Sequence, residues 1–290
     1  MISPDLRTSL IRADDARGAV ALLEMLSRAR DSFMPGSLRG EDVRLPTECP
    51  SLDVLLGGGV ESGALTEFFG EAGTGKTNVC LQLARNVARD GGKVLYVDTE
   101  GVSLERLGQI AGPDARKVQQ AILFFEPFSL REQEAVLEKV VRLASSAPEV
   151  GLVVVDSATL HYRVALGAGD GVRDRRSLSA QMSNLASLAR RRDLPVVITN
   201  QVYTNVETEL LEPVGGHLLR HISKAAIRLD KAGAGRRKAT LVKHRSEAEA
   251  AVAFFELTAR GVESPGVAQP ARATGIAPRE IAGDVRQPDV

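Results

Sequence analysis

The chain has 290 residues, of which 43% are hydrophobic and 26% are charged, as is typical of a soluble globular protein with a sizeable core. Its 37 basic residues are balanced by 37 acidic residues, so the net charge points to no particular partner and only local clusters of charge are informative. The two cysteines exclude a disulfide framework, and the lack of an apolar run of about 18 residues excludes a membrane span, so we expect a cytoplasmic protein.

The first 44 residues are predicted to be a lead-in that precedes the main domain. The stretch Ala16–Arg30 has the spacing of an amphipathic helix, and Phe33–Gly40 has the turn-forming residues of a linker. Residues 263–290 are rich in proline, alanine and glycine, a composition typical of a disordered tail. We therefore expect a lead-in helix and linker at 1–44, a core domain at 45–262 and a tail at 263–290.

From residue 45 onward, short apolar runs alternate with helix-like segments. The predicted strands are Leu65–Phe69, Val94–Val97, Ala121–Phe125, Leu152–Val155 and Pro195–Thr199. The predicted helices are Lys76–Arg89, Leu104–Ile110, Leu130–Ala144 and Leu178–Arg192. Strands without polar alternation belong in a sheet that is buried on both faces, and strand–helix alternation predicts a mostly parallel sheet with right-handed crossovers.

After Gly215 the alternation of strands and helices stops. Three predicted strands, Ala225–Asp230, Lys238–Lys243 and Ala251–Leu257, follow one another without a helix between them. This pattern indicates an antiparallel extension of the parallel sheet.

The segment GEAGTGKT at residues 70–77 satisfies the pattern GxxxxGK[ST] between a predicted strand and a predicted helix. Its glycines would let backbone N–H groups turn inward around a β-phosphate, and the helix N-terminus adds a positive dipole end. Lys76 would reach the β- and γ-phosphates, and Thr77 would bind Mg²⁺ through its hydroxyl. We therefore predict an ATP and Mg²⁺ site made of Gly70, Glu71, Ala72, Gly73, Thr74, Gly75, Lys76, Thr77 and Asn78; the alternative is a chance glycine-rich turn.

Two carboxylates follow predicted strands at the edge of the sheet where such folds bind ligands. Asp156 ends an apolar run in the Walker-B arrangement and would hold the Mg²⁺ shell; the alternative is an aspartate that caps the next turn. Glu100 follows the second strand and could polarise the water that attacks the γ-phosphate; the alternative is a solvated acid in a loop.

These motifs, taken in order, resemble the RecA/RadA recombinase superfamily. The matching segments are GEAGTGKT, VDTEG at 97–101, VVDSAT at 154–159 and VITNQV at 197–202. The resemblance covers about residues 45–260. It implies an α/β fold with a RecA-like P-loop NTPase core, in which a mostly parallel twisted sheet is flanked by helices and carries the antiparallel extension.

Within this superfamily the chain is most similar to the archaeal RadB group of RadA paralogues. The core begins at residue 45 without the helix–hairpin–helix domain that RadA carries, and PVGGHLLRHISKAAIRL is followed by RRKATLVKHRS. KaiC-like ATPases and replicative helicases share the P-loop and the glutamate but lack the combination of VITNQV with GGHLLRH.

The resemblance also implies roles for individual residues. Glu100 would be the hydrolytic glutamate, and Lys76 would also take part in catalysis. Gln201 would sense the γ-phosphate and relay its presence to the loop that follows. Arg106 would lie against the adenine, although a surface salt bridge is an alternative. His221 would approach the γ-phosphate in a neighbouring subunit, which implies a homo-oligomer.

In this superfamily two loops line the axis of the filament. The first would span residues 164–176, where Arg173, Arg175 and Arg176 suit contact with DNA phosphates; a merely solvated loop is the alternative. The second, residues 202–216, contains three glutamates and no lysine or arginine, so it should repel phosphates and predicts weak strand exchange or none.

A separate stretch, residues 231–245, holds six lysines and arginines and no acid. Gly233 and Gly235 predict a hairpin tip that carries Arg236, Arg237 and Lys238, which could contact DNA phosphates; a solvated hairpin is the alternative. With 8 Phe, 3 Tyr and no Trp, the chain has few aromatic side chains that could stack on bases. We therefore expect it to contact the DNA backbone and to bind single- or double-stranded DNA independently of sequence.

From these features we predict an ATP-binding RecA-fold protein of DNA repair and homologous recombination. It would bind DNA, hydrolyse ATP slowly and act as an accessory or mediator of a RadA-like recombinase or a junction nuclease. Three alternatives stay open: a full DNA-dependent recombinase ATPase, a nucleotide-gated adaptor that does not itself bind DNA, and a KaiC-like signalling ATPase.

Overall fold

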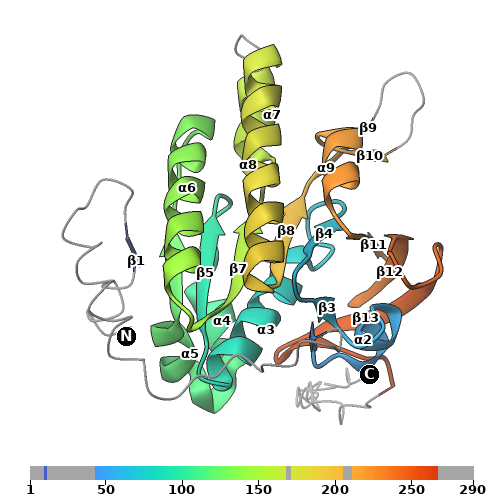
Figure 1. Cartoon of the computed structure of the whole chain (residues 1–290). Coiled ribbons are helices and arrows are strands. Elements are labelled where there is room, and N and C mark those ends of the chain that lie inside the picture. Colours follow the sequence, from blue (N-terminus) through green and yellow to red (C-terminus); the bar gives the residue numbers. More distant parts are fainter. Residues whose placement is uncertain (1–9, 12–42, 168–170, 205–210, 267–290) are drawn as a thin grey trace, which may run out of the picture.

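The computed structural model describes residues 10–11, 43–167, 171–204 and 211–266. Within them the central feature is a ten-stranded sheet in the order β1-β6-β5-β7-β8-β4-β11-β12-β13-β14 (Figure 1). Its strands are β1 (Leu10–Ile11), β4 (Leu65–Phe69), β5 (Lys93–Asp98), β6 (Ile122–Phe125), β7 (Val150–Asp156), β8 (Val196–Asn200), β11 (Ala225–Lys231), β12 (Arg236–Lys243), β13 (Val252–Thr258) and β14 (Gly261–Glu263).

The strands from β1 to β11 pair in parallel, and β11 to β14 pair antiparallel. The predicted parallel sheet with an antiparallel extension is therefore confirmed. Two short pairs lie outside this sheet: β2 (Arg44–Leu45) with β3 (Val60–Glu61), and β9 (Val202–Thr204) with β10 (Leu211–Pro213).

Helices cover both faces of the parallel part. Alternate residues of β5 enter two separate cores: Val94 and Tyr96 pack with one set of helices, and Leu95 and Val97 pack with the other. On the first side lie α2 (Pro50–Leu55), α3 (Lys76–Arg89), α4 (Leu104–Ala111) and α5 (Ala115–Ala121), with the short 3-10 turn η2 (Gly112–Asp114) between the last two. On the second side lie α6 (Leu130–Ser146), α7 (Leu160–Leu166), α8 (Gly171–Arg192) and α9 (Gly216–Ile222).

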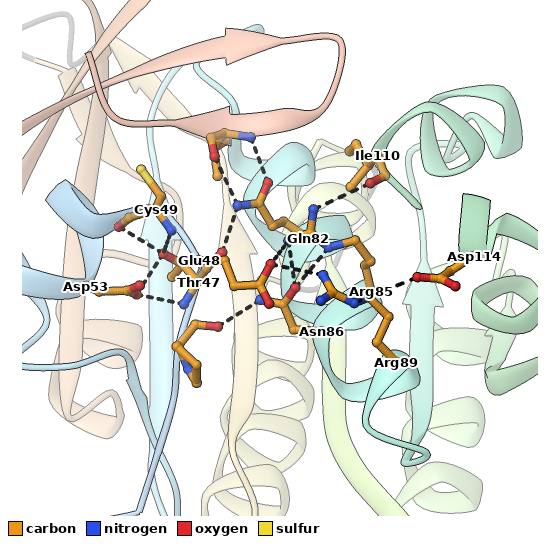
Figure 2. Close-up of polar contacts among 12 residues, drawn as sticks. Thr47, Glu48, Cys49, Asp53, Gln82, Arg85, Asn86, Arg89, Ile110 and Asp114 are labelled. Carbon is orange, nitrogen blue, oxygen red and sulfur yellow. Dashed lines mark hydrogen bonds and ion pairs between the residues drawn. The ribbon is translucent and has the colours of Figure 1, made fainter. Parts of the chain in front are cut away.

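A buried polar cluster joins helix α3 to the segment before α2 and to β14 (Figure 2). Gln82 donates to the carbonyls of Thr47 (2.7 Å) and Val262 (3.0 Å) and accepts from the Val262 N–H (2.8 Å). Arg85 contacts the carboxylate of Glu48 at 2.5 Å and the side-chain oxygen of Asn86 at 2.9 Å. These bonds fix α3 to segments from both ends of the described core.

The prediction of a flexible loop at residues 164–176 was wrong. Residues 160–166 form α7, and α8 begins at Gly171, so Arg173, Arg175 and Arg176 lie on the first turns of a helix. The error has a physical reason: the exposed start of α8 is polar on nearly every side, and apolar periodicity begins only at Leu178.

Other predictions were shifted or lie outside the described residues. Arg236, Arg237 and Lys238 form the first three residues of β12 and not the hairpin tip itself. The second loop is partly strand, as β9 and β10. The lead-in helix at 16–30, the acids at 207 and 209 and most of the tail lie outside the described residues, so the three-part division stays a prediction. None of the helices in the described segments is long and apolar enough to cross a membrane.

We predict that Gln82→Ala lowers the free energy of unfolding by about 2–4 kcal/mol. The substitution would leave buried backbone groups of Thr47 and Val262 without partners, at about 1–3 kcal/mol for each unsatisfied group. Urea denaturation measures the change, with Gln120→Ala on the exposed face of α5 as the control. Equal stability of the two variants would contradict a structural role for the cluster.

Candidate nucleotide site

The glycine-rich loop connects β4 to α3 and is closely packed by the antiparallel extension. Gly70, with φ of 151°, has no room for a side chain, because a Cβ would lie 2.1 Å from the carbonyl oxygen of Leu229 on β11. Gly75, with φ of 104°, immediately precedes α3, and a Cβ there would lie 3.0 Å from Leu257 on β13. The loop can therefore take this path only with glycine at these two positions.

Lys76 lies inside this loop. Its ammonium donates to the carbonyls of Gly70 (2.8 Å) and Glu71 (2.9 Å), and only 7% of the residue is exposed. Burial lowers the pKa of Lys76, while the carboxylates of Glu100 and Asp156 act in the opposite direction. The loop carbonyls thus bind the ammonium directly, within the electrostatic influence of the two acids. Thr77 and Asn78 follow, half-buried, in the first turn of α3.

Asp156 ends β7 and is 1% exposed. The Tyr96 hydroxyl donates to one carboxylate oxygen at 2.8 Å and the Thr199 hydroxyl donates to the other at 2.5 Å. Burial, followed by the charge of Asp156, raises the pKa of Tyr96 well above its ordinary value, so the phenol stays a donor. The two hydroxyls, from the strands on either side of β7, hold the carboxylate in one orientation.

Glu100 and Gln201 meet although they are 101 residues apart in the chain: the Gln201 amide donates to Oε1 of Glu100 at 2.7 Å. The turn that carries Glu100 is held by Asp98, whose carboxylate accepts the backbone N–H groups of Glu100 (3.1 Å), Gly101 (2.8 Å) and Val102 (2.5 Å). Burial raises the pKa of Asp98, and these N–H groups act against that shift. The backbone of the turn is thus fixed by Asp98, and the exposed Glu100 side chain is held by Gln201.

A second group of buried hydrogen bonds fixes Asn200, the residue that precedes Gln201. Asn200 accepts from the Thr159 hydroxyl (2.7 Å) and donates to Glu67 on β4 (2.7 Å) and to the carbonyl of Val214 (2.9 Å). Glu67 is 2% exposed, and burial raises its pKa. Asn200 therefore ties the strand that precedes Gln201 to the segment that leads into α9.

Sequence reasoning missed Tyr96, Asp98, Thr199, Asn200 and Glu67. Glu67, Tyr96 and Thr199 lie on predicted strands, and Asp98 and Asn200 are the residues directly after two of them. Their contacts depend on which strands are neighbours and in which register. Asp98 alone carried a local signal, because an aspartate just before a turn often accepts backbone N–H groups two residues on.

Arg106 and His221 lie in different surroundings. Arg106 donates to the side chain of Asn78 (2.7 Å) and to the carbonyl of Thr258 (2.7 Å). The alternative of a surface salt bridge is therefore wrong for the described residues. The contact with adenine stays a prediction.

His221 lines a hollow with Gly63 and Arg190, by the start of β4. The glycine-rich loop follows the opposite end of that strand, so His221 is not part of the same chain's site.

The arginines predicted to bind DNA do not lie together. Arg175 and Arg176 are exposed on α8, whereas the Arg236 guanidinium lies 4.4 Å from the centre of the Phe254 ring on β13. Arg237 points elsewhere: its Nε donates to the carbonyl of Gly73, in the glycine-rich loop, at 3.1 Å.

These residues fit a magnesium-bound nucleoside triphosphate. A glycine cradle, a buried ammonium, the Thr77 hydroxyl and an oriented Asp156 match the donors that such a ligand requires. The described residues contain no cluster of three His, Cys, Asp or Glu that could hold a metal alone. Mg²⁺ commonly takes the rest of its shell from water and substrate phosphates, so this donor set suits it.

Comparison with known proteins gives a consistent result. A model of the Rad51 family matches residues 38–265. The "DNA repair and recombination protein RadB" of Methanococcoides burtonii is 50% identical over 220 residues, which cover 76% of this chain and 97% of that protein. The protein of the same name from Halobacterium salinarum is 40% identical over 230 residues, covering 78% and 98%. A crystal structure titled "RadB recombinase" is similar with a TM-score of 0.66 and 37% identity, covering 76% of this chain and 99% of that one.

We predict that Glu67→Gln makes stability less dependent on pH. A raised pKa means that the folded state binds the proton more tightly than the unfolded state does. The wild-type protein is therefore more stable at low pH, where Glu67 is protonated. It loses stability as the pH rises from the ordinary glutamate value of 4.5 through the raised one. Urea midpoints of both proteins between pH 4.5 and 8 measure this, and the gap between them should move in favour of the variant as pH rises. A constant gap would contradict the expectation.

Proposed function

Because the chain belongs to the Rad51 family and to its RadB group, we propose that it binds ATP with Mg²⁺ and serves DNA repair by homologous recombination. The observation that carries the nucleotide part is the position of the buried Lys76 ammonium, which is held inside a glycine loop by the carbonyls of Gly70 and Glu71. The part concerning repair rests on the relatives, which carry the name DNA repair and recombination protein.

In this proposal each residue has a definite task. The loop amides and Lys76 would hold the β- and γ-phosphates, and Thr77 and Asp156 would hold the metal. Mg²⁺, when bound, supplies positive charge against the phosphate oxygens. Glu100 takes a proton from the attacking water, and Gln201 orients its carboxylate by donating to Oε1. Tyr96 and Thr199 keep Asp156 in place.

The geometry supports slow hydrolysis by a single chain. Glu100 is exposed, and a water beside it is poorly shielded from solvent. His221 lies at the start of β4, whereas the glycine loop follows the end of that five-residue strand, roughly 13–17 Å away at the usual rise per residue. A contact between His221 and a γ-phosphate therefore requires a second copy of the chain, which is our reason to propose a homo-oligomer.

We propose two separate DNA contacts. Arg175 and Arg176 are exposed at the start of α8, beside Arg173, and Arg236 and Lys238 share one face of β12. Tyr203 is exposed on β9, but its hydroxyl donates to Glu212, so this strand pair presents an acid where DNA would approach. This arrangement favours an accessory or mediator of a RadA-like recombinase or junction nuclease over a strand-exchange enzyme.

We predict that Lys76→Ala abolishes ATP binding and that Glu100→Gln retains it while hydrolysis falls at least about 100-fold, the usual scale for loss of a general base. Titration with a fluorescent ATP analogue in millimolar Mg²⁺ measures the first, and phosphate release measures the second. The two variants thus separate binding from chemistry. Full ATP affinity in the Lys76→Ala variant would overturn the proposed function.

We also predict that the double variant Arg175→Ala, Arg176→Ala binds single-stranded DNA more weakly. Two lost phosphate contacts should lower the slope of log affinity against log salt by about 1.4. Fluorescence anisotropy of a labelled oligonucleotide at several salt concentrations measures this. Arg142→Ala, an exposed arginine on α6, is the matched control. An unchanged slope would remove α8 from the DNA-binding surface.

A further inference from the structure

The hairpin of β11 and β12 extends past the end of β4 and runs beside the glycine loop. Arg228 of β11 is in register with Phe69, the last residue of β4, so the next residues of β11 lie next to the loop. The contact is close, because a Cβ on Gly70 would meet the Leu229 carbonyl at 2.1 Å. Lys231 and Arg237 face each other across the end of this hairpin.

Both of these cations lie at Gly73, in the middle of the loop. The Nε of Arg237 donates to the Gly73 carbonyl at 3.1 Å. A Cβ built on Gly73 would lie 3.6 Å from Cε and 3.9 Å from Nζ of Lys231. Two positive side chains from the hairpin therefore stand beside the same peptide of the loop, in addition to Lys76 within it.

Arg237 differs from its two basic neighbours in the direction that it faces. Side chains alternate along a strand, so Arg237 shares a face with the buried Ala239 and Leu241, whereas Arg236 and Lys238 share the other. Arg236 lies over the Phe254 ring on that second face. The basic stretch thus divides into an outer pair and one arginine that points to the nucleotide site.

The bond to Gly73 has a consequence for the next amide. In a trans peptide the N–H points opposite to the carbonyl of the same unit, so the Gly73 carbonyl and the Thr74 N–H point in opposite directions. An arginine that holds the carbonyl from the hairpin side keeps the Thr74 N–H turned away from the hairpin. Amides of such loops bind phosphate oxygens, and a nearby charge strengthens their attraction for an anion.

We propose that Arg237 and Lys231 are positioning residues of the phosphate loop, which orient the Gly73–Thr74 peptide and add positive charge for a nucleoside di- or triphosphate. The inference rests on the proposed function, since it concerns the ligand of the same loop. It removes Arg237 from the DNA-binding set and assigns it to the nucleotide. It also makes the strand that carries Arg236 and Lys238 part of the wall of the nucleotide site.

The test measures the affinity of fluorescent ADP and ATP analogues with Mg²⁺ for a set of variants. Arg237→Ala should weaken both about tenfold, and Lys231→Ala should weaken both about threefold. Arg237→Lys, which retains the charge, should recover part of the loss. Arg228→Ala, an exposed arginine on the opposite face of β11 from Lys231, should change nucleotide affinity less than twofold. Thermal unfolding without nucleotide checks that each variant is folded.

The outcomes separate this inference from the function on which it rests. If Lys76→Ala abolishes nucleotide binding while Arg237→Ala, Arg237→Lys and Lys231→Ala leave it unchanged, the positioning role is overturned and the ATP site stands. If Lys76→Ala also leaves binding unchanged, the ATP site itself fails. A loss of DNA affinity without nucleotide in the Arg237→Ala variant, at unchanged nucleotide affinity, would make Arg237 a DNA contact and overturn the proposal.

Discussion

The packing of the glycine loop against β11 and β13 is the contact on which the rest of the structure depends. At Gly70 the loop meets the Leu229 carbonyl, and at Gly75 it meets Leu257 and Phe255. The parallel sheet, which carries the acids of the site, is thereby joined to the antiparallel extension, which carries the basic hairpin. The β11 backbone at Gly70 and the side chains of β13 at Gly75 leave no room for a side chain on the loop, so the loop and the extension form one wall.

Buried polar contacts of helix α3 support this wall from the other end of the loop. Helix α3 begins where the loop ends, and its side chains Gln82, Arg85 and Asn86 bind segments from before α2 and from β14 (Figure 2). Gln82 is 2% exposed and its amide bonds are all directed at backbone groups, the arrangement in which a buried polar group stabilises a fold and specifies it. Glu100 and Gln201, to which we assign the chemistry, lie instead just past the carboxyl ends of β5 and β8. The buried contacts of α3 therefore fix the position of the loop, while Glu100 stays exposed to solvent.

Local patterns were enough to predict the glycine loop, the strands β4 to β8 and β11 to β13 and the acids at the ends of β5 and β7, because each depends on one continuous segment of sequence. The family resemblance assigned Glu100 and Gln201 to the same phosphate, but the hydrogen bond between them was not predicted. The hydrogen bonds from the Tyr96 and Thr199 hydroxyls to Asp156 require that β5 and β8 both lie beside β7. No short sequence pattern reveals that arrangement. Arg237 shows the same limit: a run of positive charge indicates DNA, but the direction of each side chain depends on the register of the strand.

The segment from Asn200 to Ile222 has a further property that follows from its bonds. The Val214 N–H donates to the Gln201 carbonyl at 2.9 Å, and the Val214 carbonyl accepts from the Asn200 amide at 2.9 Å, so Val214 is held on both sides directly before α9 begins. At the far end of α9, Lys243 donates to the carbonyls of Arg220 (2.6 Å) and Ser223 (2.7 Å), which neutralises the end of the helix dipole beside His221. The start of this segment carries Gln201, which we assign to the chain's own nucleotide, and its end carries His221, which we assign to a neighbour's. The bonds at Val214 join the backbone at Gln201 to the residue that precedes the N-cap of α9, so they fix the end of β8 relative to the start of this helix.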